Sequence, residues 1–151
     1  MKLRHDMLTH GVNIVTAAHG SKRGGLAVAW ATQTSTDRVL ICVGSQSWTR
    51  QLILDAKAFG LNVLRKDQKA IAGLFGRKSS KDVDKFEKVR FHTLETGSPL
   101  LDDCALALDC IVVDAFDVNS GKHKLILGQV VAAEQIRDEF EPLIYREADF
   151  E

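Results

Sequence analysis

The distribution of hydrophobic positions along the chain predicts a protein built mainly from β-strands. Short apolar runs, bounded by polar or turn-forming residues, recur throughout the 151 residues, which is the pattern of buried strands. We expect strands over residues 12–18, 26–34, 39–43, 61–64, 89–94, 105–118 and 123–136. Residues 119–122 separate the last two runs and predict a hairpin turn, in which Gly121 supplies a positive φ.

Two segments have the three-to-four-residue spacing of an amphipathic helix. Residues 49–59 place their apolar side chains on one face, and Gly60 predicts the end of that helix. Residues 67–75 predict a second helix, with Asp67 as its N-cap and Gly76 as its stop.

Neither a linker nor an internal repeat interrupts this pattern, so we expect one domain over residues 1–151. Many strands with two inserted helices favour a β-barrel, because closure removes exposed sheet edges. The polar segment at residues 77–88 is expected to form a surface loop with a helical turn.

The amino-acid composition limits the classes of partner and the cellular compartment that we expect for this protein. Lysine and arginine total 20, as do aspartate and glutamate, and this balance argues against nucleic acid as the main partner. No apolar run approaches the roughly 18 residues that a membrane helix needs. The N-terminal residues lack the apolar core of a signal peptide. The three cysteines are an odd number and read as buried free thiols, so we expect a cytoplasmic protein.

The stretch at residues 39–53 runs from an apolar strand through a hydroxyl-rich turn into the first predicted helix. Ser45, Gln46, Ser47 and Thr49 stand at the helix start, where free backbone N–H groups carry a partial positive charge. The spacing alone leaves two interpretations open. The turn binds an anion, or Ser47 or Thr49 simply caps the helix.

Other common catalytic and metal-binding patterns are missing from the sequence. Four histidines show no metal-ligand spacing, and there is no Cys-x-x-Cys motif. A Gly-x-Gly-x-x-Gly turn between a strand and a helix is also lacking, so a Rossmann dinucleotide site is not supported. These histidines are His5, His10, His19 and His92.

Several short motifs follow one another in a defined order along the chain. They are GVNIVT at 11–16, GLAVAWATQTS at 25–35, the stretch at 39–53, AFGLNVL at 58–64, AGLFG at 72–76, DKF at 84–86, GKH at 121–123, LGQV at 127–130 and PLIYR at 142–146. In this order and spacing, the chain resembles the flavin reductase-like family of FMN-binding split barrels. The resemblance covers nearly the whole chain and implies a mostly β fold with a few helices.

The resemblance also implies an FMN site and assigns residues to it. Lys85 would neutralise the phosphate, whereas Arg77, Lys78 and Lys81 are read as a solvated loop. The residues that it assigns to cofactor binding are Ala27, Val28, Ala29, Trp30, Ser45, Gln46, Ser47, Thr49, Phe75 and Lys85.

Three aromatic residues have both a functional and an ordinary interpretation. Trp30 is either a wall for the flavin ring or a core residue. Trp48 either covers the ligand or packs on a neighbouring subunit. The resemblance places His123 near the reactive face of the flavin, as an orienting residue rather than a general base, whereas a lone histidine is usually structural or exposed.

The chain departs from the family pattern at three places. Ala27 and Ala29 stand where relatives often carry Thr and Ser, whose hydroxyls can bond flavin. Residues 36–39 replace a Pro-Pro pair, and Lys122 replaces an acidic residue.

The function that the resemblance implies is NAD(P)H-dependent flavin reduction, with FMN at the interface of a homodimer. Two alternatives remain open at this point. One is a flavoredoxin-like carrier that passes electrons to a redox partner protein, and the other is an FMN-binding module without NAD(P)H turnover. The sequence does not choose between NADH and NADPH. No metal site is expected.

Overall fold

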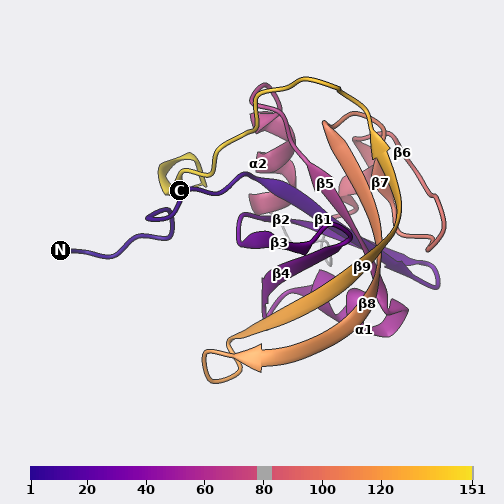
Figure 1. The fold of residues 1–151 in the computed structure, drawn as a ribbon, viewed down its shortest axis with the longest axis horizontal. Helices are drawn as coiled ribbons and strands as arrows, with labels where there is room; N and C mark the ends of the chain where they lie inside the picture. The colour runs from indigo at the N-terminus through magenta and orange to yellow at the C-terminus, as the bar shows by residue number, and fades with distance from the viewer. Residues whose placement is uncertain (78–82, 151) are drawn as a thin grey trace.

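A curled antiparallel sheet forms the body of the molecule (Figure 1). The computed structural model describes residues 1–77 and 83–150. The strands are β1 (Asn13–His19), β2 (Lys22–Val28), β3 (Ala31–Ser35), β4 (Arg38–Gly44), β5 (Ala58–Val63), β6 (Phe91–His92), β7 (Leu100–Leu101), β8 (Leu106–Val118) and β9 (His123–Gln135). The helices are α1 (Trp48–Ala56) and α2 (Lys69–Arg77), and the 3₁₀ turns are η1 (Lys85–Glu87) and η2 (Glu147–Phe150).

Seven strands pair in the order β2-β1-β5-β8-β9-β4-β3, and β6 pairs with β7 separately. The edge strands β2 and β3 follow each other directly in the chain, joined only by Ala29 and Trp30. The sheet therefore curls until its two edges approach each other, although no ladder joins them in the described ranges. A mostly β, split-barrel architecture is confirmed.

The long β8–β9 hairpin confirms the turn predicted at residues 119–122. Gly121 has φ +82°, and Asn119 and Ser120 also adopt left-handed conformations. The hairpin extends along one side of the molecule (Figure 1). A Cβ atom on Gly128 would overlap the Phe59 ring, so this strand needs a glycine where it crosses the core.

Several predicted boundaries are wrong. The predicted strand at 26–34 is interrupted at Ala29 and Trp30, and the one at 89–94 is reduced to β6. Gly60 does not end the first helix, because Lys57 takes the left-handed C-cap position (φ 57°) and Gly60 belongs to β5.

The second helix begins at Lys69 and runs to Arg77. Asp67 is therefore not its N-cap, and its carboxylate pairs with Arg65 instead. Gly76 lies within the helix rather than stopping it, and a Cβ atom there would lie 3.3 Å from the Phe150 ring.

Strand β1 is buried on both faces and separates two apolar clusters. Val15 and Ala17 face the cluster inside the barrel, whereas Ile14 and Val12, which comes just before the strand, face the cluster under α2. This alternation is the period-two pattern of a strand. Helix α1 packs on β1 and β2, and α2 packs mainly on β2, so both helices reach the same edge of the sheet.

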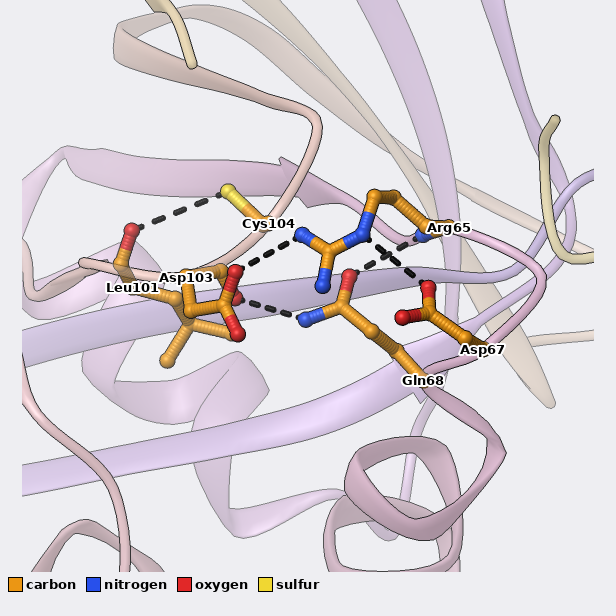
Figure 2. Close-up of polar contacts among 6 residues, drawn as sticks. All are labelled: Arg65, Asp67, Gln68, Leu101, Asp103 and Cys104. Carbon is orange, nitrogen blue, oxygen red and sulfur yellow. Dashed lines mark hydrogen bonds and ion pairs between the residues drawn. The ribbon is translucent and has the colours of Figure 1, made fainter. Parts of the chain in front are cut away.

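A polar network fixes the chain where β5 leaves the sheet (Figure 2). Arg65 contacts Asp67 at 3.0 Å and Asp103 at 2.7 Å. The side chain of Gln68 accepts from the Arg65 backbone N–H at 3.0 Å and donates to the Asp103 carbonyl at 2.8 Å. These bonds tie the start of α2 to the loop before β8.

The N-terminal segment runs beside the C-terminal one. The Val12 N–H donates to the Leu143 carbonyl at 2.7 Å, and the Tyr145 N–H donates to the His10 carbonyl at 2.8 Å. None of the helices in the described ranges has the length and apolar character needed to cross a bilayer.

Candidate functional site

Two cavities adjoin each other along β2. One, of about 250 Å³, lies between β2, the start of α1, and α2. The other, of about 230 Å³, lies between β2, β4 and the start of β9. Leu26 and Ala27 line both, so the two cavities form one groove along this edge strand. We call them the anion end and the ring end.

The anion end gathers residues from four elements. Ser47 is the N-cap of α1, and its hydroxyl oxygen accepts from the Arg50 backbone N–H at 3.3 Å. The capping interpretation is therefore correct for Ser47, and it does not compete with anion binding, because the hydroxyl can still donate its proton. The predicted residues lining this end are Ala27, Gln46, Ser47, Thr49, Phe75 and Lys85.

Lys85 supplies the positive charge of the anion end. Its side chain is 2% exposed, and Nζ donates to the carbonyls of Gly25 at 3.0 Å and Phe75 at 2.7 Å. Among the described residues no carboxylate forms an ion pair with it. Burial lowers the pKa of Lys85 to about 8, since desolvation disfavours the ammonium form.

The ring end is lined by β2 and by aromatic side chains. Ala27, Val28, Ala29, Trp30 and His123, which the resemblance assigned to one site, all border it. The rings of Trp30 and His123 have centroids 5.8 Å apart. Asn119 donates from its side-chain amide to Nδ1 of His123 at 3.2 Å, which orients the imidazole.

Three further residues line the ring end and were not among the predicted site residues. The His5 ring lies 5.8 Å from that of Trp30, centroid to centroid, and is tilted to it by 41°, and the His5 carbonyl accepts from Trp30 Nε1 at 3.3 Å. A contact of 2.5 Å between His5 Nδ1 and Glu147 Oε1 fixes this N-terminal segment. Cys42 and Tyr145 complete the wall. His5 lies outside the motifs that carry the resemblance, and the pairing of the terminal segments brings it together with Tyr145, whereas Cys42 lies on β4.

Not every residue of the prediction reaches the groove. Ser45 lines neither cavity, and its backbone N–H donates to the Lys122 carbonyl at 3.0 Å. Arg77 donates to the Asp149 carbonyl at 2.9 Å. Lys78 and Lys81 lie outside the described residues.

The groove combines two different chemical environments. One end offers a buried ammonium group, hydroxyls and a helix N-terminus, which suits an anion. The other offers flat aromatic and small apolar surfaces, which suit a planar ring. Within residues 1–77 and 83–150, no cluster of His, Cys, Asp or Glu is arranged to hold a metal ion.

Comparison with known proteins gives relatives over most of the chain. Residues 3–151 match the family described as "Flavin reductase like domain". A ferric-chelate reductase (NAD(P)H) of Archaeoglobus fulgidus is 32% identical, over 87% of this chain and 79% of that protein. The reductase component of a Rhodococcus opacus 4-nitrophenol monooxygenase is 33% identical, over 82% of this chain and 65% of its own length. An FMN reductase (NADH) of Bradyrhizobium diazoefficiens is 31% identical, over 82% and 68%.

Solved structures agree with these matches. The NADH:FAD oxidoreductase of Streptomyces globisporus is 28% identical with a TM-score of 0.83, covering 91% of this chain and 82% of that one. The flavoredoxin of Methanosarcina acetivorans shares the fold, with a TM-score of 0.87 at 18% identity, over 99% and 87%. The groove along β2 and the relatives across the chain support the same conclusion: this protein belongs to the flavin reductase-like family.

Proposed function

We propose that the chain binds FMN in the groove along β2 and catalyses its reduction by NADH or NADPH. The names of the relatives support this activity, since they include an FMN reductase (NADH) and a ferric-chelate reductase (NAD(P)H). The observation that carries the proposal is Lys85, a buried ammonium group that no carboxylate neutralises among the described residues. A charge in that position is expensive unless an anion accompanies it.

The anion end fits a phosphate group. An ammonium group has three donors, and Lys85 uses two of them on carbonyl oxygens, which leaves one for a ligand. Gln46, Ser47 and Thr49 add donors beside the first turn of α1. Charge-assisted hydrogen bonds to phosphate are among the stronger polar interactions in proteins.

The ring end orients the reacting partners. Bound flavin would supply the two-electron redox chemistry, while the protein supplies binding and geometry. Trp30 offers an aromatic surface, and His123, held by Asn119, stands at the rim where a second ring could approach. Orientation rather than proton abstraction is the contribution we assign to His123.

Ala27 and Ala29 provide no hydroxyl to the ring end. As β2 is an edge strand, alternate backbone groups of the strand lie outside the sheet ladder. We infer that such backbone groups replace the missing hydroxyls as partners of the ring. This arrangement makes affinity depend more strongly on the phosphate.

We also propose a homodimer and a redox partner protein. Ile111, Val113 and Phe116 on β8 are each more than 40% exposed, so they form an exposed apolar surface on this strand. The Rhodococcus opacus relative is named as the reductase component of a monooxygenase, which supports transfer of reduced flavin to a second protein.

The three cysteines are free thiols, in keeping with a cytoplasmic location.

Anaerobic stopped-flow spectroscopy tests the activity. We expect NADH or NADPH to bleach the visible band of FMN bound to the protein, and steady turnover to saturate with added FMN. His123→Ala should slow this reduction while leaving FMN affinity nearly unchanged. If neither nucleotide reduces the flavin but dithionite does, the reductase assignment is wrong and a carrier or binding module replaces it.

Titration with FMN and riboflavin tests the phosphate site. Lys85→Ala and Thr49→Ala should each weaken FMN by about 10-fold or more, because a charge-assisted bond is lost, and should barely affect riboflavin. Lys69→Ala is the matched control, since Lys69 is an exposed lysine paired with Asp149 at 2.8 Å. Equal affinities of the wild-type protein for FMN and riboflavin would remove the phosphate site.

A further inference from the structure

The turn that carries Lys85 is held by an ion pair outside the groove. Asp84 precedes η1 as its N-cap, and its Oδ1 accepts from the Phe86 backbone N–H at 3.1 Å. Arg23 on β2 binds the same carboxylate with two groups, Nε to Oδ1 at 3.2 Å and Nη2 to Oδ2 at 2.7 Å. One carboxylate thus both caps the turn and attaches it to the sheet.

Strand β2 anchors this turn a second time through its main chain. The Gly25 carbonyl accepts from Lys85 Nζ, and Gly25 lies two residues after Arg23 on the same strand. A Cβ atom on Gly25 would lie 2.7 Å from the Phe75 ring, so only glycine permits this approach. Strand β2 therefore fixes the position of the ammonium group twice, through the Arg23–Asp84 ion pair and through the bond from Lys85 Nζ to the Gly25 carbonyl.

Aromatic packing restrains the arginine. Its guanidinium carbon lies 5.7 Å from the centroid of Phe86 and 5.0 Å from that of Phe91. Phe86 in turn packs edge-on against Phe75, at 5.4 Å, and Phe75 lines the anion end. Arg23 and Asp84 have side-chain exposures of 36% and 37%, so the pair is partly exposed, and neither residue lines the anion end.

The ion pair also neutralises the negative charge of Asp84, which would otherwise repel an anionic ligand. Asp84 is adjacent in sequence to the lysine of an anion site, where a free carboxylate would repel the ligand. The hydrogen bonds from Arg23 hold the pKa of Asp84 below its usual range, so the carboxylate stays ionised and is neutralised by the arginine. Its charge is thus used to hold the turn.

We propose that Arg23 and Asp84 are positioning residues that fix Lys85 at the anion end of the groove and thereby set the preference for a phosphorylated ligand. This inference rests on the proposed phosphate site. Its alternative is that the pair contributes only to the stability of the fold.

The substitution Asp84→Asn separates these explanations by the sign of its effect. Removing one negative charge near an anion site would strengthen phosphate binding if charge alone mattered. Asparagine keeps an acceptor for the Phe86 N–H but cannot bind Arg23 as an ionised fork. We therefore expect FMN to bind about 5- to 10-fold more weakly, with riboflavin unchanged.

Two further variants keep the test independent of folding defects. Arg23→Lys retains a point charge without the fork and should fall between wild type and Arg23→Ala in its preference for FMN. Asp149→Asn breaks the ion pair with Lys69 near α2 and should leave the preference unchanged. A variant that only loosens the fold lowers the affinities for FMN and riboflavin together.

Lys85→Met distinguishes failure of this inference from failure of the proposed function. If Lys85→Met leaves the ratio of FMN to riboflavin affinity unchanged, the phosphate site itself is wrong. If Lys85→Met abolishes the preference while Asp84→Asn preserves or increases it, the site stands and the positioning role is overturned. Binding of inorganic phosphate to the flavin-free protein, followed by phosphorus NMR, should weaken in the same order across the variants.

Discussion

At the scale of single residues, the buried charge of Lys85 is unfavourable in the free protein and is the basis of the proposed phosphate site. Its ammonium group is buried against two backbone carbonyls, and burial lowers its pKa to about 8. The charged form is therefore disfavoured in the free protein near that pH. A bound phosphate would reverse this, because an opposite charge at close range favours the ammonium form.

The affinity for FMN should therefore depend on pH in a defined direction. A phosphate monoester becomes a dianion above about pH 6. Lys85 is charged below about pH 8 in the free protein and loses its proton above it. We expect FMN affinity to be greatest between these values and to fall as pH rises through 8 to 9.5, while riboflavin affinity stays flat.

Fluorescence titration from pH 6 to 9.5 measures this dependence. Binding raises the pKa of Lys85, so the decline continues above pH 8 rather than ending there. Lys85→Met should bind FMN weakly at every pH and show no decline. Constant wild-type affinity between pH 7 and 9.5 would contradict the role of this lysine.

At the scale of elements, local patterns predicted which elements exist better than where they end. The β8–β9 hairpin was predictable because its turn chemistry is local and requires positive φ. The helix end predicted at Gly60 was wrong, because glycine often follows a helix but has another role here. Gly60 lets β5 approach Leu100, since a Cβ atom at this position would lie 2.7 Å from a Leu100 methyl group. The break at Ala29–Trp30 follows from the curl of the whole sheet, and no residue there signals it.

The site residues likewise include some that local sequence motifs predict and some that they do not. Ser47, Thr49 and Lys85 belong to motifs that can be read in the sequence, and the structure brings them to one cavity. His5 could not be predicted, because the N-terminal segment reaches the ring end only through its pairing with the C-terminal segment.

His92 connects the small sheet to β9 and should make stability depend on pH. Its Nδ1 lies 2.5 Å from Asp102 Oδ1, and its Nε2 contacts Glu134. Hydrogen bonds that His92 donates to Glu134, first, and to Asp102 raise the pKa of His92 above its usual value. The stabilisation is complete below the unfolded-state pKa of about 6.5 and is lost as pH rises through the higher folded-state value.

Urea unfolding at pH 5.5 and pH 9 tests this dependence. His92→Gln should lower the free energy of unfolding by about 1 kcal/mol at pH 5.5, the scale of two partly exposed ion pairs, and much less at pH 9. His19→Gln, at an exposed position at the end of β1, should have little effect at either pH. An equal loss at both pH values would show that protonation of His92 is not involved.

At the scale of the whole molecule, one chain supplies a groove along the edge of an open sheet, and a planar ligand lying there would remain accessible from outside. Ile111, Val113 and Phe116 give β8 an apolar outer face, which is exposed to solvent in a single chain. A second copy packing there would bury this face, and Trp48 at the anion end would be available to cover the ligand or the partner. The homodimer remains a prediction.

Light scattering coupled to size exclusion should give about twice the 16.7 kDa mass of the chain. The double variant Val113→Glu and Phe116→Glu should shift the protein to monomer, since two buried charges at an interface lack partners. Leu94→Glu, which changes a 39%-exposed leucine elsewhere, is the matched control and should stay dimeric. We expect the monomeric variant to lose FMN affinity, because one wall of the site is removed. A wild-type protein that is monomeric yet binds FMN would overturn the interface site and any role of Trp48 across it.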